Sequence, residues 1–455
     1  SILPLNIELP KPLAKAWKIK SGQPFSLNDL TPYIPDLKRR VDRLIRAKGD
    51  NIERYTDDEQ ALAGFAYQIQ LLEQAGGINA LLKIIPPETG EEWLSPWMVR
   101  EQKSSHASLE HWARIAQAWQ ENNAALWRSE TEEALKIAHA HPSVTPLRLS
   151  AELFYHTLSP MGTAMCLYLA AFLLLIARPL SPDQPWRQIA GVTLGLAAIL
   201  HATGLMLRIY ILERPPVGTL YESILFVSLI GVLISIGLER RTRDTTGIMA
   251  GVISGGILLS LATAFSDDDS FTMLTAVLNT NFWLTVHVLC ITIGYGFCLM
   301  TGVMAHHHLW RQSWKPPSVE KVHASAYNIK TLALASLLFT AVGTALGGIW
   351  ADQSWGRFWG WDPKENGALL IVLWLSWALH GRIGNYLSQN AWIASMAFLN
   401  VIVALAWFGV NLLGTGLHSY GFIEGVSMGL AGFCLAEILL IAWLWHRVPQ
   451  RGTVT

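Results

Sequence analysis

Long apolar runs, separated by short charged connectors, fill the sequence from about Ala151 to its end. Each run contains about 20 residues, which is the length of helix that crosses the hydrocarbon core of a bilayer. The sequence therefore predicts a mainly α protein, a polytopic bundle of transmembrane helices. Nine spans are predicted, at about residues 153–177, 187–211, 219–238, 247–265, 282–304, 328–349, 367–384, 392–411 and 427–446.

Residues 1–150 differ from this pattern because they are polar and rich in charge. In their second half, apolar residues recur at the three- and four-residue spacing of an amphipathic helix. We therefore expect two domains, a helical domain over residues 1–150 and a transmembrane domain over residues 151–455. The apolar positions that carry the helical pattern are Leu109, Trp112, Ile115, Ala116 and Trp119.

The basic residues of the connectors predict the orientation of the spans. They concentrate at one set of helix ends, and the positive-inside rule places that set in the cytoplasm. With nine spans, residues 1–150 are then extracytoplasmic and the C-terminus is cytoplasmic, as in a multi-pass protein of a bacterial inner membrane. The basic set comprises Arg178, Arg187, Arg240, Arg241, Arg243, Arg311, Lys315, Arg382, Arg447 and Arg451. The exceptions on the opposite, periplasmic side are Arg208, Arg214, Arg357 and Lys364.

The polar domain cannot reach the outside unaided, and no signal peptide or earlier span precedes it in the sequence. We therefore expect the chain to be the C-terminal portion of a longer or processed polypeptide. No enzyme motif is recognisable in residues 1–150. A partner-docking role and a plain helical spacer both remain open for this domain.

Charge and cysteine content exclude two classes of protein. The formal net charge is +0, which gives no preference for nucleic acid or another polyanion. The four cysteines fall within apolar runs and form no Cys-x-x-Cys-His motif, so the chain is not itself a c-type cytochrome. We expect them to be small buried hydrophobes. They are Cys166, Cys290, Cys298 and Cys434.

The connector between the sixth and seventh predicted spans is rich in tryptophan, and we call residues 350–366 the tryptophan segment. Its last residues have a structural interpretation. Asp362 can be a helix N-cap, Pro363 suits the first helical position, and Glu365 completes a capping box. This part therefore predicts the start of the seventh helix.

The capping pattern does not explain the indoles of the tryptophan segment. Tryptophan favours membrane–water interfaces, so one or two of these side chains are explained by anchoring. Four indoles interleaved with glycines also suit a flat aromatic platform for a planar macrocycle, whose propionates would meet Arg357 or Lys364. Anchoring and a large planar ligand are both open at this point. The residues concerned are Trp350, Trp355, Trp359 and Trp361, with Gly356 and Gly360.

Ionisable residues in transmembrane segments indicate function because leaving them unpaired in lipid is costly. His287 lies in the first turns of the fifth span, and His418 lies in a glycine-rich outer segment after the eighth. Both are predicted at the membrane face that carries the tryptophan segment. Two neutral imidazoles can supply both axial ligands of a heme iron. A hydrogen-bonded packing role is the alternative for each.

Three further histidine positions need an interpretation. His380 lies about four turns into the seventh span, which suits a second heme position inside the bilayer or a polar contact between helices. His201, in the second span, is a possible partner for it. The run at residues 306–308 is interpreted as a solvated helix end that begins a cytoplasmic connector, or as a site for adventitious metal.

The residues Trp355–Glu365, in the pattern Trp-Gly-x-x-Trp-x-Trp-Asp-Pro-Lys-Glu and flanked by His287 and His418, resemble the signature of the heme-handling protein superfamily. Within that superfamily the chain is similar to the CcsA (ResC) type component of the system II cytochrome c synthase. The resemblance extends over the membrane region and includes Arg208–Ser223 and Val410–Tyr420.

The resemblance implies a cytochrome c heme lyase, or holocytochrome c synthase, that acts in cytochrome c biogenesis. Heme b is then a non-covalently held substrate, presented at the outer face until two thiols of a Cys-x-x-Cys-His segment add to its vinyl groups. No side chain of the enzyme need be a nucleophile, because the protein contributes orientation and exclusion of oxygen. The residues matched to heme binding are His287, His418, His380, Trp355, Gly356, Trp359, Trp361 and Asp362.

The same resemblance assigns roles and partners. His287 and His418 match the axial ligands of the outer heme, which keep its iron reduced, and His380 matches the inner heme site. The second ligand of the inner site comes, in the family, from a CcsB (ResB) type partner or fused half. The implied further partners are apocytochrome c, a thiol-reducing thioredoxin-like protein and membrane lipids, with no nucleic acid.

One departure from the family pattern concerns the end of the signature. The family usually continues with a threonine and a tryptophan, where this chain has Asn366 and Gly367. Two other functions are compatible with parts of the sequence. A b-type membrane cytochrome would need paired histidines at two depths, of which one pair is evident. A transporter would need inverted repeats or broken midplane helices, and the sequence shows neither.

Overall fold

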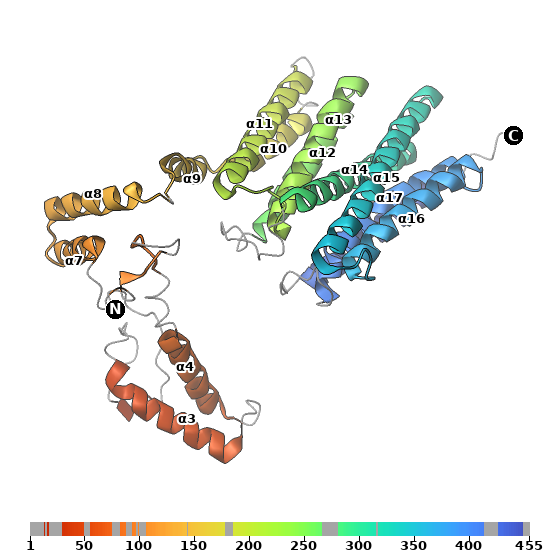
Figure 1. Cartoon of the computed structure of the whole chain (residues 1–455). Helices are drawn as coiled ribbons and strands as arrows, with labels where there is room; N and C mark the ends of the chain where they lie inside the picture. Colours follow the sequence, from red (N-terminus) through yellow and green to blue (C-terminus); the bar gives the residue numbers. More distant parts are fainter. Residues whose placement is uncertain are drawn as a thin grey trace. The chain divides into compact units, whose positions relative to one another are not determined.

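The computed structural model describes residues 13, 16–17, 30–49, 55–74, 82–87, 93–96, 99, 106–142, 144–177, 185–265, 281–314, 317–413 and 426–448. The chain forms two compact units, Ser1–Pro146 and Leu147–Thr455. Both are helical where they are described (Figure 1), apart from an isolated antiparallel bridge between Ile85 and Leu94. The mainly α architecture predicted from the sequence is therefore confirmed.

The first unit contains η1 (Thr31–Tyr33), α3 (Ile34–Lys48), α4 (Asp57–Gln74), α7 (Ala107–Gln120) and α8 (Ala124–Ala140). The second begins with α9 (Pro146–Leu158), α10 (Pro160–Ala177), α11 (Trp186–Leu212), α12 (Leu220–Thr242) and α13 (Thr246–Thr263). It continues with α14 (Asn281–Trp314), α15 (Val319–Trp355), α16 (Pro363–Ile383), α17 (Gln389–Trp407), η6 (Gly409–Leu413) and α18 (Val426–Arg447).

The helices of the first unit pack through small apolar clusters. Leu37 of α3 packs with Phe65 and Ile69 of α4. In α7 the apolar spacing predicts the buried position of Ile115 correctly, whereas Trp119 is 67% exposed. The predicted face is wrong at Trp119 because the buried side of α7 continues through Ala118.

Eight helical stretches among the described residues are long and apolar enough to cross a membrane. They confirm a polytopic membrane bundle and coincide with eight of the nine predicted spans. The ninth prediction falls on α16, which is less apolar than the others. Lys364 and Glu365 stand in its first turns, and His380 and Arg382 in its last.

Helix α16 nonetheless runs the length of its neighbours. It has 21 residues, which at 1.5 Å per residue give about 30 Å, the thickness of a hydrocarbon core. It packs against both α15 and α17, to which short connectors join it. Because these connectors reverse the direction of the chain, α16 is antiparallel to both helices. A membrane crossing between the spans α15 and α17 requires this direction.

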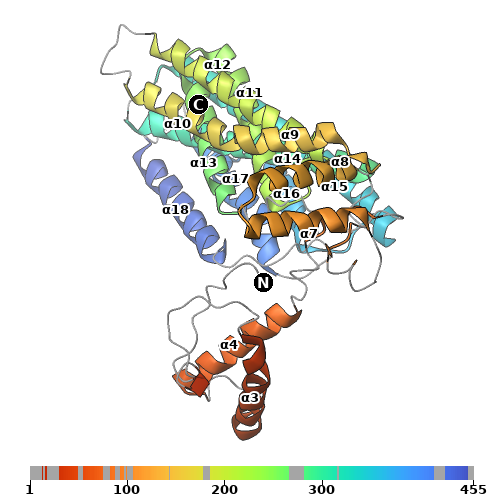
Figure 2. The same ribbon diagram turned by 90° about the vertical axis from the view of Figure 1, so that its left-hand side faces the viewer.

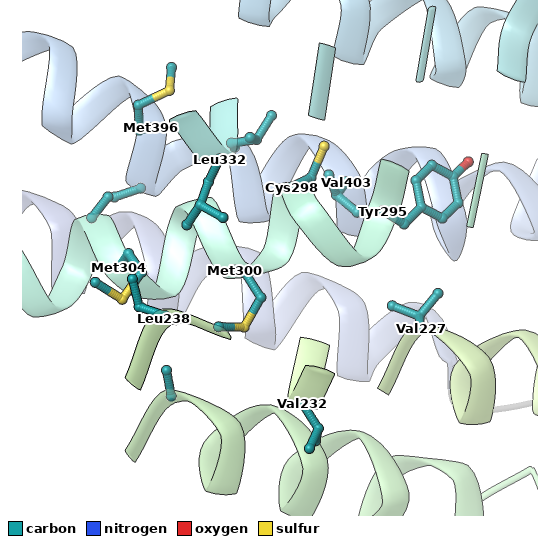
Figure 3. Packing of buried hydrophobic residues seen from close by; sticks show 14 of the residues in the cluster. Val227, Val232, Leu238, Tyr295, Cys298, Met300, Met304, Leu332, Met396 and Val403 are labelled. Carbon is teal, nitrogen blue, oxygen red and sulfur yellow. The ribbon is translucent and has the colours of Figure 1, made fainter. Parts of the chain in front are cut away.

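Helix α14 is the centre of the bundle. It contacts α12, α13, α15, α17 and α18. Figure 3 shows its side chains, such as Met300, between Val232 of α12 on one side and Leu332 of α15 on the other. Met300 and Val232 are fully buried. The packing around α14 therefore fixes where the first turns of this helix present His287.

Small residues bring α14 and α15 close together. A Cβ added at Gly294 of α14 would lie 2.7 Å from Thr340 Oγ1, and one added at Gly343 of α15 would lie 2.9 Å from the backbone nitrogen of Ile291. Both distances are too short for a real side chain. The backbones of the two helices thus approach at a distance that only glycine allows, as is common in membrane bundles.

From α12 onward, every second helix ends on basic residues, as the connector charges predict. Basic side chains occupy the last turns of α12, α14, α16 and α18. Two of the cations that break the predicted pattern, Arg208 and Arg214, lie within one ion-pair cluster. Glu222 accepts from Arg208 at 3.2 Å and from Arg214 at 2.6 Å. Their positive charge is thus shared with a buried carboxylate and does not contradict the orientation.

The buried carboxylate Glu222 predicts a large effect on stability. The side chains of Arg208 and Glu222 are both 0% exposed. Glu222→Gln should lower the free energy of unfolding in mixed micelles by about 3–5 kcal/mol, because it leaves buried guanidinium groups without their carboxylate. The control is Glu213→Gln, which removes the carboxylate of the largely exposed pair with Arg148 and should cost at most about 1 kcal/mol. Equal effects of the two substitutions would contradict the role of Glu222.

Candidate heme site at the end of α14 and α15

The tryptophan segment begins inside a helix. The sixth span was predicted to end near residue 349, but α15 continues to Trp355. No residue between Trp350 and Trp355 breaks a helix, and the stop comes at Gly356, whose φ of 70° only glycine adopts without strain. Its N–H donates to the Asp352 carbonyl at 2.9 Å. The connector itself is therefore Gly356 to Asp362.

The four indoles form two perpendicular pairs. Trp350 and Trp355, in the last turns of α15, meet edge to face with ring centroids 4.6 Å apart and an interplanar angle of 70°. Trp359 and Trp361 of the connector are 5.9 Å apart at 89°. The rings thus offer separate faces and edges, which differs from the single flat platform envisaged from the sequence. Trp350 is 2% exposed and Trp361 is 69% exposed.

The end of the connector is a capping box, as predicted. Asp362 accepts from the N–H of Lys364 at 2.9 Å, and Glu365 accepts from the N–H of Asp362 at 3.1 Å. Glu365 also accepts from the N–H of Gly360 at 2.7 Å, a contact that the sequence did not predict. One carboxylate thus holds the connector on both sides of Trp361.

Trp361 has a left-handed backbone, with φ of 56°. A bulky residue rarely adopts this conformation, and the strain costs about 1–2 kcal/mol. The side-chain amide of Asn366 donates to the carbonyl of Trp361 at 2.9 Å and so holds the strained peptide. Gly367 lies against α17, where a Cβ would be 2.9 Å from the Cα of Ala406. Both departures from the family signature therefore have a structural role.

Arg357 and Lys364 are the cations of this region. The Arg357 guanidinium occupies the space beside Gly360 that any side chain would need. Lys364 is the second residue of α16, two positions after the N-cap Asp362.

His287 is oriented by a backbone hydrogen bond between helices. Its Nδ1 lies 2.7 Å from the carbonyl oxygen of Gly343. A carbonyl only accepts, so Nδ1 carries the proton and Nε2 of the neutral ring has the lone pair. This is the arrangement in which a histidine binds a metal through one nitrogen while the other is held by a backbone carbonyl. The ring is parallel to Trp350 within 7°, with centroids 6.5 Å apart.

Gly347 makes room for the His287 ring. A Cβ added at Gly347 would lie 2.5 Å from Cε1 of His287, too close for any side chain. One turn earlier, Gly343 supplies the carbonyl that the ring contacts. Neither glycine was predicted from the sequence as part of the site. The signal that would have found them is their four-residue spacing, which is common where membrane helices pack closely.

The other histidines predicted to bind heme are His418 and His380, with His201 as a possible partner of His380. His418 lies outside the described residues. His380 is exposed in the last turn of α16, where its Nδ1 donates to the Ser376 carbonyl at 2.7 Å. His201 is fully buried and lies 3.2 Å from the Tyr168 hydroxyl. The structure therefore does not bring His201 and His380 together.

The interpretation of residues 306–308 as a solvated helix end is wrong. Helix α14 continues to Trp314 because no residue before Pro316 interrupts it. His308 is 3% exposed and contacts the Ser325 hydroxyl at 2.9 Å, and His306 contacts Glu437. Within the described part of the chain, no three His, Cys, Asp or Glu side chains gather as metal ligands would. The cysteines were expected to be buried. Cys298 is buried, whereas Cys166 is exposed.

Comparison with known proteins identifies the family. The family model described as cytochrome C assembly protein matches residues 217–418. The cytochrome c biogenesis protein CcsA of Adiantum capillus-veneris is 30% identical over 277 residues, which cover 50% of this chain and 85% of that protein. The chain belongs to the CcsA family. Its role in cytochrome c biogenesis and the resemblance found in the sequence are thereby confirmed.

Other relatives are similar to parts of this CcsA-type chain. Protein NrfI of Wolinella succinogenes is 31% identical over 278 residues, covering 59% of this chain but 30% of NrfI. The chain thus spans less than a third of that relative. Among solved structures, cytochrome c heme lyase CcmF aligns with 68% of this chain and 52% of its own, at a TM-score of 0.47 and 17% identity.

The strained backbone and exposed ring of Trp361 predict that it contributes little to stability. Trp361→Gly should change the free energy of unfolding by less than about 1 kcal/mol. Relief of the left-handed strain, about 1–2 kcal/mol, is offset by the entropy of glycine in the unfolded chain, about 0.5–1 kcal/mol. The buried Trp350 is the comparison, because Trp350→Ala should cost about 3–5 kcal/mol. A loss from Trp361→Gly as large as that from Trp350→Ala would show that the Trp361 ring is structural.

Proposed function

We propose that this chain binds heme b at the outer face of a bacterial cytoplasmic membrane and presents it to apocytochrome c. In this proposal it acts as a cytochrome c heme lyase together with a CcsB (ResB) type partner. The observation that carries the proposal is the hydrogen bond from His287 Nδ1 to Gly343. It orients the imidazole and leaves the proton off Nε2, the nitrogen that binds iron.

Several further contacts support a heme at His287. The ring of His287 stands beside Trp350, and Trp355 is edge to face with Trp350. An iron on Nε2 would therefore place the porphyrin at the tryptophan segment. His287 precedes the tryptophan signature in the sequence and His418 follows it. His418 is proposed as the second axial ligand. Two imidazoles fill both axial positions and leave no site for oxygen on the iron.

The cations Arg357 and Lys364 suit the heme propionates. Arg357 lies over Gly360, and Lys364 is the second residue of α16. One propionate beside each cation would complete an ion pair. The Trp361 ring is exposed on a backbone of left-handed conformation. It would then contact the vinyl edge of the heme, which lies across the porphyrin ring from the propionates. We propose Trp355, Gly356, Trp359, Trp361 and Asp362 as the remaining heme-binding residues.

The attachment reaction needs no nucleophile from this chain. Each thiol of a Cys-x-x-Cys-His segment adds across one vinyl group, so that sulfur bonds to one vinyl carbon and the thiol hydrogen is transferred to the other. The thiols must be reduced beforehand, which a thioredoxin-like protein would ensure. The residues of the chain hold the heme edge near the thiols and exclude oxygen, and this orientation lowers the entropic cost of the encounter.

His380 is proposed as a ligand of a second, inner heme position. Its Nδ1 is held by the Ser376 carbonyl, as in an oriented metal ligand, and the ring is exposed on the last turn of α16. An exposed position suits a heme shared with a CcsB-type partner. His201 does not supply the second ligand in this proposal because it is enclosed by α10 and α11. A b-type cytochrome, which needs two complete pairs, is therefore not favoured.

Covalent attachment of heme tests the two outer ligands. The chain is expressed with a CcsB-type partner and an apocytochrome that carries Cys-x-x-Cys-His, and covalent heme is measured by staining after denaturing electrophoresis. His287→Ala and His418→Ala should each lower the yield at least about tenfold, and added imidazole should restore it by replacing the missing ligand. The control is His323→Ala, which changes an exposed histidine near the start of α15. An undiminished yield in both ligand variants without imidazole would refute the assignment.

The recess at Gly347 gives a second test that leaves every histidine in place. Gly347→Ala adds a Cβ 2.5 Å from the His287 ring and should displace it from its position against α15. We expect the absorption spectrum of the purified protein to lose its low-spin, six-coordinate heme. Gly195→Ala is the matched control, because it also adds a methyl group to a membrane helix but meets nothing within 4 Å. Unchanged spectra for both variants would show that iron is not bound at His287.

A further inference from the structure

A cavity of about 1060 Å³ lies between α13, α14, α17 and α18, away from the tryptophan segment. Figure 2 shows α18 at one edge of the bundle. The size is at the upper end of the range of about 300–1,000 Å³ that is typical for sites of small molecules. Most of its lining is apolar, with side chains such as Met249, Ile253, Leu258 and Phe433. The proposed function uses no residue of this cavity.

Three polar side chains from three helices meet at the cavity. His306 of α14 contacts Glu437 of α18, with Nε2 and Oε2 2.9 Å apart. Asn400 of α17 donates from Nδ2 to the other oxygen of Glu437 at 3.1 Å. All three residues line the cavity. Gly302 of α14 leaves the space for Asn400, because a Cβ there would lie 2.0 Å from Asn400 Oδ1.

The cluster fixes the position of the Glu437 carboxyl group. His306 Nδ1 lies 2.8 Å from the Gly302 carbonyl, so this nitrogen carries a proton. Each oxygen of Glu437 has one protein partner in these contacts and retains capacity to accept another hydrogen bond.

The lining determines which ligands the cavity can take. It contains no Lys or Arg among the described residues, and its one acidic group is Glu437. A phosphate or a carboxylate therefore meets a group that can be negative, and the His306 imidazole is already in contact with that group. The apolar walls instead suit a hydrocarbon chain. The Glu437 oxygens suit a hydroxyl group that donates a hydrogen bond.

We propose that this cavity binds an uncharged membrane lipid that has a hydroxyl head group. The hydroxyl donates to Glu437, which His306 and Asn400 hold in place, and the hydrocarbon part lies between α13 and α18. Reduced prenyl quinones and diacylglycerol share this chemistry. Ionisable groups inside a membrane are costly, and a ligand of this kind gives the His306–Glu437 pair a function that packing alone does not.

Lipid retained by the purified full chain tests the proposal. The protein is incorporated into phospholipid nanodiscs that contain a small fraction of either diacylglycerol or a prenyl quinol, re-purified in detergent, and analysed for bound lipid by mass spectrometry. Each lipid has a partner without the hydroxyl, namely triacylglycerol and the oxidised quinone. We expect about one molecule of the hydroxyl lipid per protein and at least tenfold less of its partner. The ratio of quinol to diacylglycerol retained identifies the source.

Two glycines of α18 provide a matched pair of variants. Gly429 lines the cavity and a Cβ added there meets nothing within 4 Å, so Gly429→Leu should project a side chain into the cavity without disturbing α18. Gly432 also has open space around it but is not part of the lining, so Gly432→Leu is the control. Retention should fall at least tenfold in Gly429→Leu and stay unchanged in Gly432→Leu. Glu437→Gln, which removes the charge and keeps the shape, should weaken retention about tenfold.

Other occupants would overturn the proposal. Equal retention with and without the hydroxyl would exclude recognition of the hydroxyl by Glu437. Equal retention in Gly429→Leu and the wild type would exclude binding in this cavity. Heme or phospholipid recovered from the wild type and lost only in Gly429→Leu would show that the cavity serves another ligand. Because all variants keep His287 and the tryptophan segment, heme attachment can be measured in parallel. Failure of that activity alone would concern the proposed function and not the cavity.

Discussion

The hydrogen bond from His287 to the Gly343 carbonyl exists only because α14 and α15 approach as closely as glycine allows. Gly343 meets the backbone at Ile291, and Gly347 leaves the recess in which the imidazole lies. A helical carbonyl that already accepts within its own helix can take a second donor, and the side chain of another helix reaches it only at short range. The end of the bundle that carries the tryptophan segment is thus built on backbone contact between α14 and α15.

The same bundle buries several ionisable side chains, and each is matched by a partner from another element. Glu222 at the start of α12 joins Arg208 of α11 and Arg214 of the following turn. Elsewhere in the bundle, Glu437 of α18 joins His306 of α14. Such pairs stabilise weakly in net terms, because desolvation offsets most of the attraction, but breaking one is costly. They consequently specify which helices are neighbours.

The sequence predicted the parts of the fold that depend on local patterns. Apolar length located α11, α12 and the other spans, and the pattern from Asp362 to Glu365 located the capping box of α16. The spacing of residues 109–119 predicted a helix but misplaced Trp119, since a few positions do not determine which side faces the core. The end of α15 was placed too early because hydropathy falls at the polar residues after Trp350, whereas the helix itself continues to Gly356.

The candidate site was predicted as a set of residue types, and its geometry was not. His287 was identified from its depth in a span, yet its tautomer depends on Gly343, 56 positions away in the sequence. The histidines at 306–308 were assigned to a connector because they precede Arg311, and only the packing of α17 and α18 against α14 shows that His306 is an interior residue. Contacts of this kind depend on tertiary structure, and a local pattern carries no signal for them.

The most direct test of the central claim is a density map of the heme-loaded complex with a CcsB-type partner and apocytochrome c, obtained by electron cryomicroscopy. The account predicts the outer heme iron at bonding distance from Nε2 of His287, with Nδ1 still donating to the Gly343 carbonyl. The porphyrin edge should lie beside the tryptophan segment. An outer heme whose iron is bound elsewhere, with His287 remote from it, would contradict the account.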